Sequence, residues 1–240
     1  MNSIETILSP RLFDGRTTPA GHVSVAVDIL RATTSICAAF AAGAEAVVPL
    51  DSLEKLEDYR GTGCLLAAER GGRKVGDAQC GNSPTEYLTM DLHGRRLAYS
   101  TTNGTVAILR AAAVGDTLIG CFSNLAALAE RLQQECRDVV LLCSGWEGSA
   151  SMEDTLFCGA LAERLVANGR FKPLDDATTM AMRLWRQASA DLYDFCSAAT
   201  HVHRLQALDY DRDIRFALTV DTCRLVPQVR QGDDGFVITL

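Results

Sequence analysis

Several features are absent from this 240-residue chain, and each absence excludes a class of protein. No run of Lys or Arg is long enough to form a nucleic-acid-binding arm, and the formal net charge is −7. The nine cysteines form no CxxC pair and no other zinc-binding spacing. Residues 1–10 lack the basic region and long apolar run of a signal peptide or membrane span. We therefore expect a cytoplasmic protein with reduced thiols and no nucleic-acid or membrane partner.

The chain also lacks a Pro-rich or Ser-rich linker, a low-complexity segment and a clear internal repeat. Hydrophobic residues make up 48% and charged residues 22%, which is an ordinary balance for a globular protein. This length suits one large α/β domain. We predict a single domain over residues 1–240, with two closely packed lobes as the alternative.

Apolar runs alternate with helical patterns along most of the chain. The predicted strands are residues 22–28, 45–50, 63–68, 96–100, 117–121, 139–143 and 236–240. The predicted helices are residues 32–42, 51–60, a short helix starting at 83–84, 104–113, 124–136 and 152–168, with a helical region at 175–217. Continuous apolar strands that alternate with helices predict a three-layer α/β/α fold with a largely parallel or mixed central sheet.

Clusters of small and polar residues follow four of the predicted strands. They begin at Asp28, Glu69, Ser100 and Ser144. In open α/β sheets, ligands bind beyond the carboxyl ends of the strands. Carboxylates, hydroxyls, Arg side chains and the N–H groups of helix starts suit a phosphate ester with a divalent cation. The placement therefore predicts a site that processes an anion.

Three polar segments of the chain have structural interpretations as well. Asp28 is equally compatible with a cap on the helix that follows it. The sequence 103–105, Asn-Gly-Thr, is typical of an ordinary turn and cap. Ser151 to Asp154 has the form of a capping box, in which Asp154 would reach back to the backbone of Ser151.

Other catalytic motifs are incomplete. His201 and His203 are two residues apart on a predicted helix and point to different sides, which disfavours a zinc pair. Cys143 lacks the Arg that follows the nucleophile of tyrosine phosphatases by six residues, because Ser149 stands there. Asp28 lacks the second Asp of the haloacid dehalogenase DxD motif.

Three segments stand out as motifs: VDILRATT at residues 27–34, GNSP at 81–84 and STTNGT at 100–105. They resemble the VD-x-LRATT, GNSP and STTNGT motifs of the 2-phosphosulfolactate phosphatase (ComB) family. Further matches, in family order, are Cys143-Ser144-Gly145, Glu153-Asp154, Gly159, His201, Leu205, Asp209 and Val226-Pro227. A departure precedes GNSP, where Gln79 replaces an Asp of many relatives.

The resemblance implies hydrolysis of (2R)-2-phospho-3-sulfolactate to 3-sulfolactate and phosphate with Mg²⁺, in the route to coenzyme M. The expected ligand is thus a small phosphorylated sulfonate or carboxylate. A homodimer is left open.

Roles within the site follow as hypotheses. We expect Asp28, Arg31 and Glu69 to be catalytic. The expected Mg²⁺ ligands are Asp28, Glu69 and Asp154, with Glu147 in reserve. Arg31 and Arg70 would bind phosphate or sulfonate oxygens. The remaining expected substrate contacts are Asn82, Ser83, Ser100, Thr101, Asn103, Gly104, Thr105 and Ser144.

Alternatives stay open at this stage. Attack by metal-activated water is the first hypothesis, and a covalent phospho-aspartate at Asp28 is its rival. A non-catalytic sensor of a phosphorylated metabolite or nucleotide is the chief alternative function, although it gains nothing from carboxylates beside a phosphate. A structural or assembly protein is a second alternative, which the polar strand ends disfavour.

Overall fold

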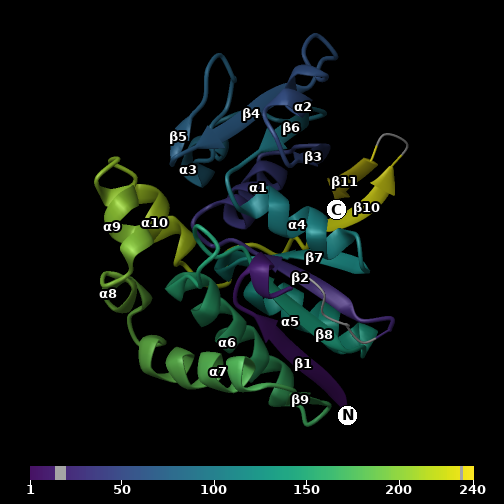
Figure 1. Cartoon of the computed structure of the whole chain (residues 1–240), viewed down its shortest axis with the longest axis vertical. Coiled ribbons are helices and arrows are strands. Elements are labelled where there is room, and N and C mark those ends of the chain that lie inside the picture. Colours follow the sequence, from purple (N-terminus) through teal and green to yellow (C-terminus); the bar gives the residue numbers. More distant parts are fainter. Residues whose placement is uncertain (14–19, 233–234) are drawn as a thin grey trace.

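The computed structural model describes residues 1–13, 20–232 and 235–240 (Figure 1). The strands are β1 (Asn2–Ile7), β2 (Val23–Val27), β3 (Ala46–Leu50), β4 (Leu65–Arg70), β5 (Arg73–Lys74), β6 (Arg96–Ser100), β7 (Asp116–Gly120), β8 (Val139–Cys143), β9 (Phe171–Pro173), β10 (Gln228–Gly232) and β11 (Gly235–Thr239). The helices are α1 (Ala32–Ala41), α2 (Glu54–Glu57), α3 (Pro84–Tyr87), α4 (Gly104–Ala112), α5 (Leu125–Glu135), α6 (Met152–Val166), α7 (Asp176–Ala188), α8 (Leu192–Cys196), α9 (Thr200–Gln206) and α10 (Asp211–Ala217), with short 3-10 turns at Pro10–Leu12 and Phe122–Asn124. None of the described helices is long and apolar enough to cross a membrane.

All the described strands join one mixed sheet in the order β5-β4-β6-β3-β11-β10-β7-β2-β8-β1-β9. Strands β4, β6 and β3 form one parallel group, and β7, β2, β8, β1 and β9 form another. The antiparallel hairpin β10–β11 lies between the groups, which splay apart on either side of it (Figure 1). The predicted α/β fold with a mixed, mostly parallel sheet is confirmed.

Helices cover both faces of the sheet, as β8 illustrates. Val140 and Leu142 pack in one apolar cluster with Ala111 of α4. The alternate residues of the same strand, such as Leu141, belong to the main core together with Phe157 of α6. Because successive side chains of a strand point to opposite faces, α4 and α6 lie on opposite sides of β8. This burial explains the unbroken apolar sequence of the strand.

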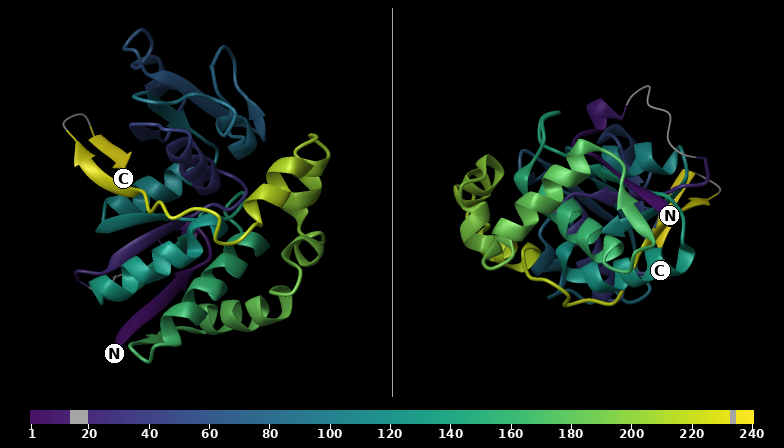
Figure 2. Two further views of the ribbon diagram at one scale, coloured as in Figure 1. Left: turned by 180° about the vertical axis from the view of Figure 1, so that it is seen from behind. Right: turned by 90° about the horizontal axis from the view of Figure 1, so that it is seen from below.

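Helices α8, α9 and α10 form a column along one side of the molecule, apart from the layers on the sheet (Figures 1 and 2). The helical region predicted at 175–217 is thus confirmed as α7 to α10. The loop after β2 runs between the two parallel groups toward this column. The column supplies one wall of the cavity described below.

The prediction was wrong in two respects. The helix expected at 51–60 is limited to Glu54–Glu57, with Leu53 as its N-cap residue. Strands β1, β5, β9 and β10 were missed. Strand β1 was missed because its sequence, NSIETI, is largely polar, although Glu5 and Thr6 are buried.

Candidate active site

Asp28 follows β2 directly and lies at the start of two helices. Its Oδ1 accepts a hydrogen bond from the backbone N–H of Ala32, the first residue of α1, at 3.2 Å. Gly104, the first residue of α4, lies so close that a Cβ there would be 2.5 Å from Asp28 Oδ2. The positive ends of both helix dipoles therefore face this carboxylate, and they favour an anion at the same place.

The Asp28 carboxyl is held in its neutral form more readily than a solvated one. Its pKa is raised to about 6, chiefly by burial; His201 and the Ala32 N–H lower the pKa, while the charges of Glu69 and Glu153 help to raise it. Desolvation penalises the charged form of a carboxyl group. A cation beside Asp28 would offset that penalty.

Glu69, the next-to-last residue of β4, is bonded within the tight turn that follows the strand. The backbone N–H of Gly72 donates to Glu69 Oε1 at 2.5 Å, and Thr102 donates to both carboxylate oxygens through its N–H and its hydroxyl. Gly71 and Gly72 have φ values of 64° and 83°, which a glycine adopts without strain. A Cβ at Gly72 would lie 2.7 Å from Leu208, so the turn packs tightly against the helical column.

A small cavity brings together residues from both parallel groups. Five of the residues expected in the site line it, namely Asp28, Arg31, Glu69, Asn82 and Asn103. The other lining residues are Leu30, Gly72, Thr102, Trp146, His201, Arg204 and Leu205. The strand ends of β2 and β4 thus meet here even though the hairpin separates their groups in the sheet.

Arg31 is bound on several sides by the protein itself. Its Nη1 lies 2.9 Å from Asp213 Oδ2, its Nη2 donates to the carbonyl of Gly72 at 2.6 Å, and its Cζ lies 4.0 Å from the ring centroid of Tyr210. Both Arg31 and Asp213 are 2% exposed. Asp213 of α10 and Tyr210, the residue before that helix, were not predicted from the sequence.

Arg70 does not line this cavity, contrary to the role expected for it. Its Nη2 donates to Ser100 Oγ at 2.9 Å and its Nη1 donates to the carbonyl of Glu69. The Ser100 hydroxyl donates in turn to the carbonyl of Ser52. Arg70 and Ser100 therefore join the ends of β4 and β6 to the loop after β3.

Asn82 and Ser83 differ in what their side chains do. Asn82 Oδ1 accepts from the buried hydroxyl of Tyr99, which orients the amide at the cavity wall. Ser83 caps α3 by accepting from the N–H of Glu86, and its hydroxyl donates to Asp213 Oδ1 at 2.8 Å. Ser83 thus supports the partner of Arg31.

Gln79, the departure from the family motif, lies at the surface. Its Oε1 accepts from the N–H of Leu66 in β4 at 2.8 Å. The side chain is exposed and is absent from the lining of the Asp28 cavity. Its replacement of an Asp therefore leaves the carboxylates of the cavity unchanged.

Thr101 and Thr105 build the start of α4. The N–H of Thr105 donates to the Thr101 hydroxyl at 3.2 Å, and the N–H of Thr101 donates to the Thr105 hydroxyl at 3.2 Å. Both residues are buried and neither lines the cavity. Their role here is to hold Asn103 at the cavity wall and Gly104 beside Asp28.

Asp154 fixes two loops through its carboxylate. Its Oδ1 accepts from the N–H of Ile29, and its Oδ2 accepts from the N–H of Gly145 and the hydroxyl of Ser144. Burial and the charges of Asp28 and Glu153 raise its pKa well above the ordinary value, against these hydrogen bonds. With its oxygens used by the backbone, Asp154 positions the loop that carries Asp28.

The expected Mg²⁺ ion requires oxygen donors that converge on one point. Among the described residues, no three Asp, Glu, His or Cys side chains converge as a preformed metal cage. Mg²⁺ is commonly held by one or two carboxylates, with waters and substrate phosphate completing its coordination. Asp28 and Glu69, which share one cavity, fit that second kind of site. Glu147 is exposed and belongs to a neighbouring cavity, so it does not join them.

Helix α9 and the loop after β8 complete the cavity wall. The Trp146 ring stacks on the His201 ring at a centroid distance of 6.0 Å, and the Cζ of Arg204 lies 5.2 Å from the centroid of the same indole ring. His201 Nδ1 lies 3.3 Å from Glu153 Oε1. His203 is exposed, as the predicted helical spacing required. Arg204 was not predicted from the sequence, although it ends the segment HVHR (residues 201–204) that contains both His residues.

Cys143 has no character of a nucleophile. Its Sγ lies 3.4 Å from the Sγ of Cys158, and both side chains are fully buried. The hydrogen bond to Cys158 and burial raise the pKa of Cys143 well above its usual value. All nine cysteines, which lie in the described part of the chain, are free thiols.

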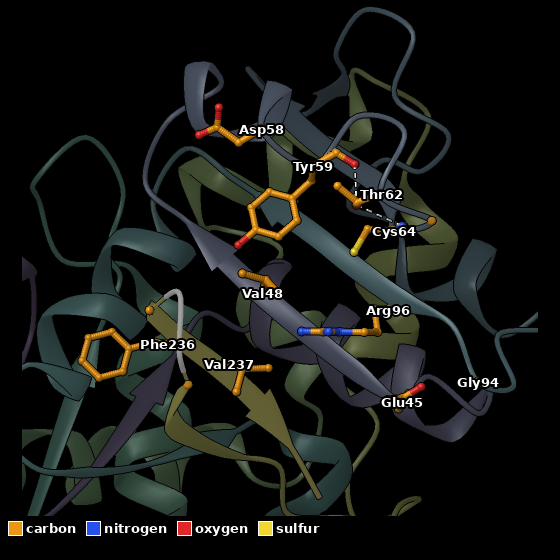
Figure 3. Close-up of a pocket in the computed structure, with 13 residues that line it drawn as sticks. Glu45, Val48, Asp58, Tyr59, Thr62, Cys64, Gly94, Arg96, Phe236 and Val237 are labelled. Atoms are coloured by element: carbon orange, nitrogen blue, oxygen red, sulfur yellow. Dashed lines mark hydrogen bonds between the residues drawn. The ribbon is translucent and has the colours of Figure 1, made fainter.

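A larger cavity lies elsewhere, at the amino ends of β3, β4 and β6 beside the hairpin (Figure 3). Its volume is about 650 Å³. Glu45, Asp58 and Arg96 stand on its walls together with the aromatic rings of Tyr59 and Phe236. With two carboxylates against one guanidinium, it suits an anionic ligand less well than the Asp28 cavity does.

Comparisons with known proteins agree with the geometry. The model of the family described as "2-phosphosulpholactate phosphatase" matches residues 7–232. A "Probable 2-phosphosulfolactate phosphatase" of Caldanaerobacter subterraneus is 34% identical over 212 residues, covering 87% of this chain and 88% of that protein. Proteins with the same description from Synechocystis sp. and Thermosynechococcus vestitus are each 39% identical, over 87% and 85% of this chain and 90% and 87% of their own lengths. The chain belongs to the 2-phosphosulfolactate phosphatase family.

Proposed function

We propose that this protein is a Mg²⁺-dependent phosphatase that hydrolyses (2R)-2-phospho-3-sulfolactate to 3-sulfolactate and phosphate. One observation carries the proposal beyond family membership. Asp28 lies where the N-termini of α1 and α4 meet, in one cavity with Glu69. A site for a phosphate and a cation needs both kinds of group together.

The phosphate would bind at the two helix starts. Asn103 at the beginning of α4 and Asn82 on the neighbouring wall can donate hydrogen bonds to its oxygens. The Asp28 carboxylate would repel a phosphate dianion if nothing lay between them. A cation, or reaction of the carboxylate itself, resolves that conflict.

Asp28 and Glu69 would hold the Mg²⁺ ion together with water and substrate phosphate. When bound, the ion would supply positive charge to neutralise the phosphoryl oxygens. Glu69 is kept in place by Gly72 and Thr102, so its position does not depend on the ion. The hypotheses of attack by water and of a phospho-aspartate at Asp28 both use this arrangement.

His201 would provide the proton that the departing sulfolactate oxygen requires. The ring lies on the cavity wall, held between the indole of Trp146 and the carboxylate of Glu153. Glu153 Oε2 has no hydrogen-bond partner among the described residues. A carboxylate beside one ring nitrogen orients the imidazole for proton transfer.

The test measures phosphate release from 2-phosphosulfolactate by the wild type and by Asp28→Asn, with Mg²⁺ present. We expect the variant to fold and to lose on the order of several kcal/mol of transition-state stabilisation. A sensor would bind the phosphorylated ligand without turnover in either protein. If Asp28→Asn keeps most of the wild-type rate, the site assignment is wrong at its centre.

A further inference from the structure

Two guanidinium groups reach the Asp28 cavity, and they differ in what neutralises their charge. Arg31 has the carboxylate of Asp213 at 2.9 Å and is 2% exposed. Two further groups, the carbonyl of Gly72 and the ring of Tyr210, contact the same guanidinium. Arg31 is therefore already compensated without a ligand.

Arg204 has no such partner. Within the part of the chain that the structure describes, no Asp or Glu lies at ion-pair distance from its guanidinium. Its Cζ lies 5.2 Å from the ring centroid of Trp146, and the Gly71–Gly72 turn lies on another side of the group. The side chain is half-buried and lines the cavity. Its N–H donors thus have an aromatic support and lack an anionic acceptor.

Arg204 also comes from a different wall than the phosphate-binding groups do. The starts of α1 and α4 meet at Asp28, whereas Arg204 projects from α9 in the helical column. His201 and Arg204 are three residues apart and share one face of α9, so both reach the cavity. The exposed His203 lies on another face.

We propose that Arg204 binds the anionic group of the substrate that is not hydrolysed, and thereby selects phosphate esters that carry a second negative charge. The inference rests on the proposed function, in which the phosphate occupies the Asp28 side. A sulfonate or carboxylate on the substrate then lies toward α9. The planar guanidinium matches two oxygens of such a group, and its Cζ lies 5.2 Å from the Trp146 ring centroid.

The interaction explains the use of Arg at this position. Lys would keep the charge, yet it would lose the paired donors and the stacking on the indole. Asp28 and Glu69 lie in the same small cavity, yet neither forms an ion pair with Arg204. Glu69 already accepts hydrogen bonds from Gly72 and Thr102, and Asp28 accepts one from Ala32. The charge therefore stays available for a ligand.

The test uses two ligands that separate the ends of the substrate. Binding of 3-sulfolactate, which has no phosphate, and of inorganic phosphate is measured by calorimetry with Mg²⁺ for the wild type, Arg204→Ala and Arg204→Lys. We expect Arg204→Ala to weaken sulfolactate binding by about 10- to 100-fold, as the loss of a charged hydrogen-bonded pair does. Phosphate binding should stay within about threefold, and Arg204→Lys should restore part of the sulfolactate affinity.

The matched control is Arg183→Ala, which removes one exposed positive charge from α7. It should change neither affinity, and thermal melting should show that all variants fold. Equal weakening of both ligands, or weakening of phosphate alone, would make Arg204 a phosphate ligand and overturn the inference. Unchanged sulfolactate binding would overturn it too. Absence of turnover in the wild type, by contrast, would refute the proposed phosphatase while these binding results still decide the role of Arg204.

Discussion

The guanidinium of Arg31 and the carboxylate of Asp213 are joined at 2.9 Å, although 182 residues separate them and each side chain is 2% exposed. Ser83 and Thr85 donate to the other oxygen of Asp213. This buried pair fastens α10 to the loop that leads into α1. Each buried charge neutralises the other, and either one alone in this environment would destabilise the fold.

Asp213→Asn should therefore destabilise the fold strongly. The substitution keeps the shape and leaves Arg31 buried without its counter-charge, at a cost of about 3–5 kcal/mol. Chemical denaturation measures the change in the free energy of unfolding. The control is Asp51→Asn, which breaks the exposed pair with Lys55 and should cost about 0–1 kcal/mol. Similar losses of unfolding free energy in the two variants would contradict the view that Asp213 neutralises a buried Arg31.

Asp28→Asn should remove a pH-dependent loss of stability from the metal-free protein. The pKa of Asp28 in the folded protein is about 6, above the ordinary value of 3.8. The wild type therefore has its full free energy of unfolding below pH 3.8, where the carboxyl is neutral, and loses part of it as the pH rises through 6. The Asn variant has no charge to desolvate. Its stability relative to the wild type should therefore rise by about 3 kcal/mol as the pH increases from 3.8 to above 6, and then stay constant.

Denaturation in chelator at a series of pH values checks this difference. Only the difference between the two proteins is diagnostic, because other carboxylates titrate in both. A constant difference across this range would mean that Asp28 is ionised throughout and is not penalised by burial.

Removal of Mg²⁺ with a chelator should abolish phosphate release, and restoring the ion should recover it. The reason is electrostatic, since Asp28 and Glu69 share the cavity in which a phosphate dianion must bind. Thermal melting in chelator serves as the control for folding. Full activity in chelator would exclude the metal and favour catalysis by arginine alone.

Cys143→Ser should keep a substantial part of the rate. The thiol is buried with a raised pKa and contacts Cys158, so no thiolate is available to attack a phosphate. A buried hydroxyl that lacks a good partner should cost about 1–3 kcal/mol of stability. Cys158→Ser is the matched control. A loss of rate as large as that of Asp28→Asn would overturn this view.

The strands with unbroken apolar sequences were predictable from local pattern. The predicted bounds 96–100 and 139–143 coincide with β6 and β8. Strand β1 was not predictable in this way, because its polar groups are satisfied by distant partners. The N–H and hydroxyl of Ser3 both bond to Asp138, and Thr6 bonds to Thr178. Those partners cannot be recognised from a window of neighbouring residues.

The candidate site, too, was predictable from the sequence only in part. The rule that polar residues gather after parallel strands located Asp28 and Glu69, which are near each other in the fold. It gave no information on the wall that α9 and α10 supply. Asp213, His201 and Arg204 lie on short helices with ordinary patterns, and only the three-dimensional fold brings them to a strand end.

The position of the C-terminal hairpin has a consequence for the order of assembly during synthesis. Strands β10 and β11 occupy the middle of the sheet, while the strands on either side come from earlier in the chain (Figure 2). Both parallel groups leave the ribosome before the residues that link them edge to edge. Until then β3 and β7 expose strand edges that can pair with other chains. A nascent chain of this topology therefore depends on its last strands to end its exposure to aggregation.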